Sequence, residues 1–204
     1  MQAGWVLRLL VLLATVSGCA ATIVRPGDLP VRPRWGTTAV PVVVALEGAP
    51  AAMADEVQQI VPSAVRDTRA APGQPLATAC PPDGDAVVLR PQVRRTYFAT
   101  NAGDRNALFI YESAIVVGLP VTLISAVAWP WYGETTIEGV LETVHCGAHA
   151  PASVVVDSYH LRSEGRGFVR GGTIKAAQEE AAARAIARKL LASWSARETT
   201  EERR

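Results

Sequence analysis

Alternation of apolar and polar positions predicts four β-strands in this chain. Two-residue periodicity or β-branched composition marks residues 38–47, 86–100, 135–145 and 152–163. The second stretch is the clearest, because Val87 and Leu89 fall on one face while Arg90 and Arg94 fall on the other. This strand is therefore expected to have one apolar face and one polar face.

Three- and four-residue spacing of apolar positions predicts two helices. The first covers residues 51–70, and Pro62 is expected to kink it. Its apolar face consists of Met53, Val57, Ile60, Ala64 and Val65. The second covers residues 174–194, with Thr173 as its N-cap and Glu180 and Arg184 as an i,i+4 ion pair. Its apolar stripe consists of Ala183, Ile186, Ala187, Leu190, Leu191 and Trp194, and we expect it to pack on the domain's own sheet.

The order of these elements is β, α, β, a long apolar insertion, β, β, α. We therefore predict one α+β domain over residues 38–196, with a mixed or antiparallel sheet of about four strands packed by two helices. Residues 197–204 are polar and are expected to form a disordered tail.

The insertion is a run without charge between Glu112 and Glu134, and its apolar part covers residues 113–132. Gly118 and Pro120 interrupt it, and aromatic residues cluster at its end. Three interpretations remain open: a buried core hairpin or helix, a loop or hairpin that dips into lipid, and a patch that docks on a partner or a second copy. The candidate contact residues are Val116, Val117, Leu119, Val121, Leu123, Ile124, Trp129, Trp131 and Tyr132.

A second apolar run, at residues 5–16, has the length of the central region of a signal peptide. It is followed by Val16, Ser17, Gly18 and Cys19, and this pattern resembles the lipobox of bacterial lipoproteins. The resemblance implies that residues 1–18 are a leader, that Cys19 is the lipidated first residue, and that lipid is the membrane partner. A plain secretory leader with a cysteine there by chance is the alternative.

Residues 19–37 contain several prolines and arginines, so we predict a tether between lipid and domain, with Trp35 tucked against the domain. Because Ala20 and Ala21 follow the cysteine without an aspartate, the lipoprotein resemblance implies the outer membrane, facing the periplasm, over retention at the inner membrane. Element order also resembles, weakly, the TolB amino-terminal-like α/β domains of envelope lipoproteins.

Charge excludes one class of partner. The chain has 20 basic and 19 acidic residues, and loss of residues 1–18 removes only Arg8, which leaves 19 of each sign. A protein without excess positive charge lacks the long-range field that nucleic-acid binding needs. We therefore expect no nucleic-acid partner.

The chain has three cysteines, and two of them, Cys80 and Cys146, remain once Cys19 is assigned to lipid. In an oxidising compartment an even pair predicts a disulfide, with two separate buried thiols as the alternative. A metal site at His145, Cys146 and His149 is disfavoured because their spacing does not converge and no second cluster completes it. We expect no metal and no cofactor.

Catalysis is also disfavoured. Asp157, Ser158, His160 and Ser163 supply the residue types of a hydrolytic triad, but Asp157 and Ser158 point to opposite faces of a strand and no nucleophile elbow is present. Glu134, Glu138 and Glu142 share one strand face as an ordinary solvated edge. The sequence therefore predicts a lipid-anchored binding or assembly module of the cell envelope with a protein partner or self-association. The alternative is a subunit of an oligomeric export complex that inserts residues 113–132 into a membrane.

Overall fold

The computed structural model describes residues 23–25, 28–35, 40–62, 64–66, 73–82, 84–103, 130–147, 152–167 and 169–201. These residues fall into two compact units. The larger unit draws on Pro26–Phe98, Thr135–Leu161 and Gln178–Arg204, and the smaller on Ala99–Glu134 and Arg162–Ala177 together with the first 25 residues. The predicted class is confirmed, because a mixed sheet and two helices make up the described fold.

The described elements follow the predicted order with two additions, the short strand β2 and the 3-10 turn η2. In chain order the elements are β1 (Val42–Val44), α2 (Ala51–Ile60), β2 (Val65–Arg66), η2 (Leu76–Ala79), β3 (Ala86–Thr100), β4 (Pro130–Cys146), β5 (Ala152–Arg166) and α5 (Gly171–Glu201). The strands form one sheet in the order β2-β1-β3-β4-β5.

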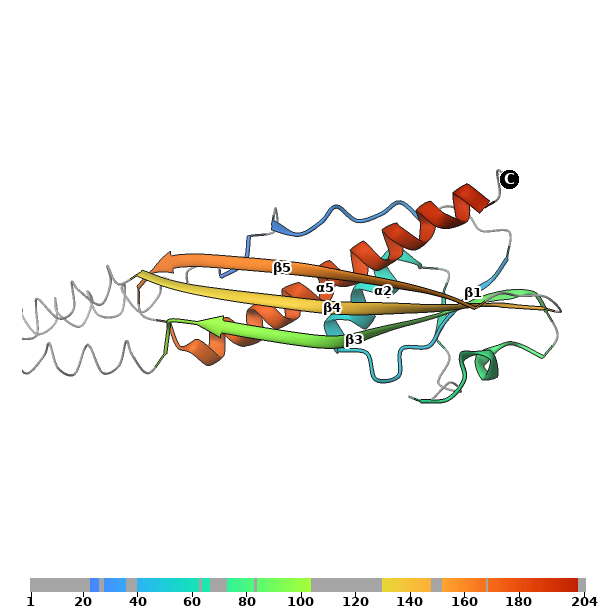
Figure 1. Ribbon diagram of the computed structural model, residues 1–204, viewed down its shortest axis with the longest axis horizontal. Coiled ribbons are helices and arrows are strands. Elements are labelled where there is room, and N and C mark those ends of the chain that lie inside the picture. The colour runs from blue at the N-terminus through green and yellow to red at the C-terminus, as the bar shows by residue number, and fades with distance from the viewer. Residues whose placement is uncertain are drawn as a thin grey trace, which may run out of the picture. The chain divides into compact units, whose positions relative to one another are not determined.

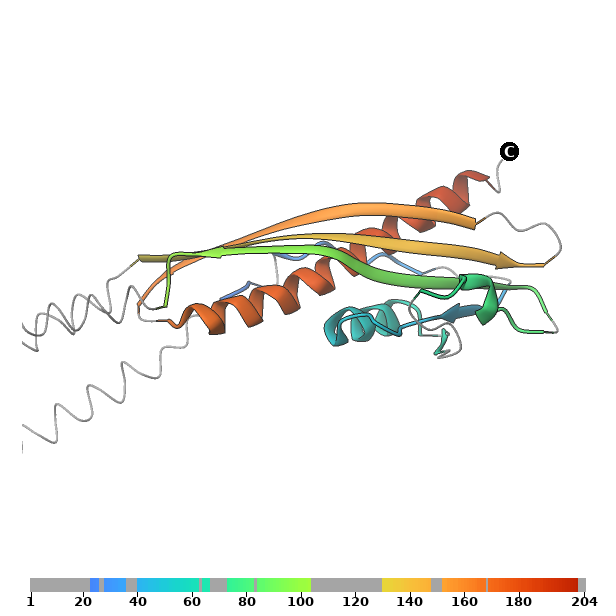
Figure 2. The same ribbon diagram turned by 60° about the horizontal axis from the view of Figure 1, so that its bottom comes forward.

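Strand pairing changes from parallel to antiparallel across β3. β1 runs parallel to β2 and to β3, with Val44 opposite Leu89. Arrowheads of β3 and β5 point the same way and that of β4 the opposite way (Figures 1 and 2). The ion pairs agree with this direction, because Arg90 pairs with Glu142 and Arg94 pairs with Glu138. The residue number increases by four along β3 while that of the partner decreases by four along β4, as in an antiparallel pair.

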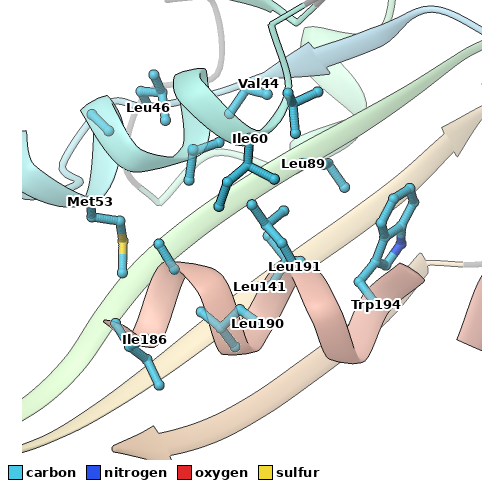
Figure 3. Packing of buried hydrophobic residues seen from close by; sticks show 14 of the residues in the cluster. Val44, Leu46, Met53, Ile60, Leu89, Leu141, Ile186, Leu190, Leu191 and Trp194 are labelled. Atoms are coloured by element: carbon cyan, nitrogen blue, oxygen red, sulfur yellow. The ribbon is translucent and has the colours of Figure 1, made fainter. Parts of the chain in front are cut away.

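The core of the larger unit lies between one face of the sheet and the two helices (Figure 3). Met53 and Ile60 of α2 and Ile186, Leu190 and Leu191 of α5 are almost fully buried there. Gly139 of β4 lies beneath α5, and an added Cβ would come within 2.6 Å of Ile186 Cγ1 and 2.9 Å of Leu190 Cδ1. α5 therefore packs on the sheet of its own chain, as its apolar stripe predicted.

In the smaller unit, Trp131 of β4 lies across Gly165 of β5. An added Cβ on Gly165 would come within 2.5 Å of the indole ring, and Trp131 is 2 % exposed. Thr100 Oγ1 donates a hydrogen bond to Tyr132 O at 2.7 Å. Thr100 and Tyr132 follow the same β3–β4 register as the pairs Arg90–Glu142 and Arg94–Glu138. No β-bulge therefore interrupts β3 between Arg90 and Thr100.

Helix boundaries required three corrections. α2 ends at Ile60, because Pro62 cannot donate a backbone hydrogen bond and disfavours the helical conformation at Val61, whose φ is −115° and ψ is 72°. Val65 therefore belongs to β2 and not to a helix. α5 begins at Gly171, so Thr173 lies inside it and is not its N-cap.

The third correction concerns the C-terminal end. α5 continues to Glu201, so residues 197–201, expected in the tail, are helical. No glycine or proline stops the helix after Trp194, and alanine, arginine and glutamate favour helix.

Candidate functional site

The N-terminal segment 28–35 contacts other parts of the larger unit at several points along its length. Tyr159 OH donates a hydrogen bond to Asp28 O, and Arg188 Nη1 donates one to Pro30 O at 2.6 Å. At the other end Trp35 stacks on Trp194, with ring centroids 5.0 Å apart and an interplanar angle of 14°. Trp35 thus packs on the domain as predicted, but the tether of residues 19–37 was drawn too long because residues 28–35 belong to the folded body.

Glu56 of α2 is the centre of this attachment. Its side chain is 0 % exposed, and its Oε1 accepts hydrogen bonds from Arg32 Nε at 2.6 Å and Arg188 Nε at 2.8 Å. Arg184 Nη1 lies 3.8 Å from Oε2. We call Arg32, Glu56, Arg184 and Arg188 the Glu56 cluster. It joins the N-terminal segment, α2 and α5 through one buried carboxylate.

The pKa of Glu56 lies below its ordinary value. Burial alone would raise this pKa, but the hydrogen bonds and positive charges of Arg32 and Arg188 outweigh the cost of burial. The Glu56 carboxylate also raises the pKa of Arg32, chiefly through the hydrogen bond between them. The carboxylate is therefore held ionised, and the cluster acts as a structural ion-pair network.

Asp157 of β5 faces α5 and forms a second, smaller network. It accepts hydrogen bonds from Lys189 Nζ and from the backbone N–H of Ser158, each at 2.8 Å. Burial alone would raise the pKa of Asp157. The two hydrogen bonds, the positive charge of Lys189 and a hydrogen bond from Ser193 outweigh burial, so the pKa lies below its ordinary value. Asp157 therefore fixes β5 to α5 as an anion.

The candidate triad residues are divided between two faces of the sheet. His160 Nδ1 lies 3.1 Å from Thr136 Oγ1 on the face away from α5, whereas Asp157 faces Lys189. Ser163 is buried at 9 % exposure. The structure thus does not bring Asp157 and His160 together.

The disulfide prediction is confirmed. Cys80 and Cys146 are bonded, with Cα atoms 5.6 Å apart and a sequence separation of 66. The bond ties the residue after η2 to the last residue of β4 beside a small core that includes Val43, Leu76 and Val88. It also removes the Cys146 thiolate from the candidate metal set; His149 lies outside the described residues.

The predicted lipidation site and most of the apolar insertion lie outside the described residues. This applies to Cys19 and to every candidate contact residue from Val116 to Trp129. Of the other two, Trp131 is covered by its own chain, and Tyr132 is 39 % exposed at the start of β4. Within the described ranges no helix has both the length and the hydropathy to cross a membrane.

The sheet face away from α5 carries the three glutamates that the sequence placed together. Each is paired with an arginine: Glu142 with Arg90 and Glu138 with Arg94, both at 3.1 Å, and Glu134 with Arg162 at 3.7 Å. The shared face is confirmed, but these side chains form cross-strand ion pairs and not a simple solvated edge.

Sequence reasoning missed the Glu56 cluster. A signal was present, because Glu56 stands three residues after Met53 and four before Ile60, on the apolar face of α2. A carboxylate in such a stripe requires partners when buried. Its partners could not be read from the sequence, since Arg32 and Arg188 are 24 and 132 positions away.

Comparison with known proteins gives little further information. No family model matches the chain, and no curated protein sequence matches it. Among solved structures, the rare lipoprotein B from Shewanella oneidensis is 8 % identical, and the alignment covers 80 % of this chain and 98 % of that one with a TM-score of 0.36. Similarity at that level carries no argument about function.

Proposed function

We propose that this protein is a lipid-anchored lipoprotein of the cell envelope that acts as a binding or assembly accessory module on the periplasmic side of the outer membrane. The observation that carries the proposal is the sequence around Cys19: an apolar run, two small residues and a cysteine in register. Several acyl chains on one residue would hold a folded domain stably on a membrane.

The attachment of the N-terminal segment gives this anchor a short reach. Tyr159 holds Asp28, and only nine positions separate Asp28 from Cys19. Since an extended chain spans at most about 3.6 Å per residue, Asp28 would lie within about 32 Å of the lipidated cysteine. The Glu56 cluster and the Trp35–Trp194 stack would keep the domain at that distance by preventing residues 28–35 from lengthening the tether.

The role proposed is binding, not catalysis. The disulfide supports an oxidising compartment such as the periplasm, because Cys80 and Cys146 are paired. The near-balanced charge supports a protein or lipid partner over nucleic acid.

The test is lipid labelling of the full chain in a Gram-negative host. We expect labelled palmitate to enter the protein and the protein to fractionate with the outer membrane. Cys19→Ala should lose the label and release the protein from membranes, whereas Ser17→Ala, which keeps a small residue, should retain both. Equal membrane association of Cys19→Ala and the parent chain would refute the proposed anchor.

The alternative function is that of a subunit of an oligomeric export complex that inserts residues 113–132 into a membrane. The absence of charge between Glu112 and Glu134 favours it. β4 takes the residues from Pro130 onward, so the stretch left before it is shorter than the roughly 20 residues of a single apolar spanning helix. A shallow insertion or a contact within the oligomer is therefore the form that this function would take.

Liposome flotation separates the two functions. The full chain carrying Cys19→Ala is compared with the same chain in which residues 113–129 are replaced by a short Gly-Ser loop. Flotation of the first and not the second, with both folded by circular dichroism, would support membrane insertion. If neither floats, the accessory-module function stands and the insertion is no membrane contact.

A further inference from the structure

We propose that the edge of β3 between Val93 and Tyr97 binds an extended, acidic peptide segment of a partner protein as an added strand of the sheet. We call these five residues the open edge. All of them belong to the larger unit. The inference deepens the proposed binding role and rests on it, but it does not depend on the lipid anchor.

Within the described part of the chain, no strand pairs with this edge. β1 ends at Val44, opposite Leu89, and the last bond between the two chain segments runs from Ala45 N to Leu89 O. Val87 N and Leu89 O both point toward β1. Because the sides alternate along a strand and no bulge interrupts the register, the backbone groups of Val93, Arg95 and Tyr97 point outward on the same side.

Four of the five residues of the open edge are exposed, and the fifth, Val93, is partly buried against the core. The run Arg94–Tyr97 is exposed on both faces of the sheet, and Tyr97 is 68 % exposed. Pro91 occupies the first outward position beyond Leu89 and offers no N–H there. A docking strand would therefore begin to pair at Val93, where the first free outward N–H stands.

Charge identifies the occupant. Arg90 and Arg94 are paired with Glu142 and Glu138 across the sheet face away from α5. Arg95 points to the other face and has no hydrogen-bond or ion-pair partner among the described residues. A strand added here would place one side chain opposite Arg95 and another, two residues away, against the ring of Tyr97. A carboxylate at the first position and an aliphatic group at the second complement these side chains.

The β5 edge of the sheet differs from the open edge, because side chains bind its backbone groups. At β5, Ser158 N donates to Asp157 Oδ1, Ser158 O accepts from Lys189 Nζ at 2.6 Å, and Val154 O accepts from Arg197 Nη1 at 3.4 Å. Side chains thus occupy backbone groups that an incoming strand would need. The open edge has no such protection in the described structure, which favours it as the binding edge.

A second copy of the chain is a poor occupant. Antiparallel pairing of two open edges about their centre would place Arg95 opposite Arg95 of the other copy, and like charges directly opposite are destabilising. An acidic segment removes this repulsion and supplies the missing partner.

The test uses the full chain in detergent and a fluorescent peptide, acetyl-Thr-Val-Thr-Glu-Thr-Val-Thr-amide, titrated by anisotropy to millimolar concentration. A matched peptide has lysine in place of glutamate. We expect the glutamate peptide to bind more tightly, and Arg95→Glu to reverse the preference, each charge change altering Kd by about fivefold. Val93→Pro should abolish binding because it removes an outward N–H, whereas Val156→Pro on the β5 edge is the matched control and should not.

Several results would overturn the inference. Absence of binding by both peptides, or the same preference in Arg95→Glu as in the parent chain, would show that the open edge does not recognise an acidic strand. Dimers that Val93→Pro dissociates would make a second copy the occupant. If Val93→Pro does not fold, the comparison of the glutamate and lysine peptides between the parent chain and Arg95→Glu decides whether the inference holds. A failed lipid-labelling test leaves this assay unaffected, so the two proposals fail separately.

Discussion

At the scale of single residues, Glu56 shows how one buried charge can organise distant parts of a chain. Its carboxylate is 0 % exposed and receives guanidinium groups from the N-terminal segment and from α5. Removing one member of a buried ion pair costs more than the pair itself contributes, because the remaining charges stay desolvated. The Glu56 cluster should therefore be sensitive to the loss of any one of its members.

We expect Glu56→Gln to lower the free energy of unfolding by about 2–3 kcal/mol, since hydrogen bonds to a charged acceptor are replaced by neutral ones. Urea unfolding at neutral pH measures the loss. Glu180→Gln is the matched control: Glu180 pairs with Arg184 at the surface, with 60 % exposure, and its loss should cost less than about 1 kcal/mol. Equal losses in both variants would contradict the central role of Glu56.

Stability should also fall in acid. The pKa values of Glu56 and Asp157 are lowered in the folded state, so their contribution is fully present above the ordinary values of 4.5 and 3.8 and is lost as pH falls below them. Urea midpoints should therefore be level between pH 7 and pH 5 and decline below about pH 4.5. Glu56→Gln should flatten part of this decline; an unchanged acid slope would exclude Glu56 as its source.

At the scale of elements, the close approach of α5 to β4 depends on glycine. Gly139→Ala should destabilise the protein by about 1–3 kcal/mol, because the added methyl group would collide with Ile186 and Leu190. Gly172→Ala is the matched control, since no atom lies within 4 Å of its added Cβ and alanine favours a helix, so its stability should stay level or rise. Thermal unfolding of both variants checks the contrast, and a neutral Gly139→Ala would mean that α5 shifts away at little cost.

Element boundaries show where local sequence was sufficient and where it was not. β3 was predicted residue for residue, because its apolar and β-branched residues run between two loop segments of clear turn composition. Val65 was placed in a helix because it follows Val57 by eight residues, a spacing that lies on one helical face. Pro62 instead ends α2, and β1 offers Val65 a parallel partner. A two-residue strand such as β2 exists only through that partner, so no local pattern could have predicted it.

At the scale of the whole molecule, the disulfide closes a loop that contains β3 and β4. Cys80 and Cys146 are separated by 66 positions, for which the chain-entropy model gives about 4 kcal/mol. We expect Cys80→Ala with Cys146→Ala to lower the free energy of unfolding by up to that amount, measured by urea unfolding without reductant. Reduction of the parent chain should produce a similar loss, and stability unchanged by both treatments would contradict the prediction.

The sequence alone determined the fold class, the strand faces and the disulfide partners, because periodicity and cysteine parity are local or countable properties. It also indicated the lipobox cysteine on which the proposed anchor rests. Only the tertiary structure decided that residues 28–35 belong to the folded body, since their attachment depends on Glu56, Tyr159, Arg188 and Trp194. The open edge likewise emerged only from the order of the described strands, because strand neighbours are set by tertiary pairing and not by local sequence.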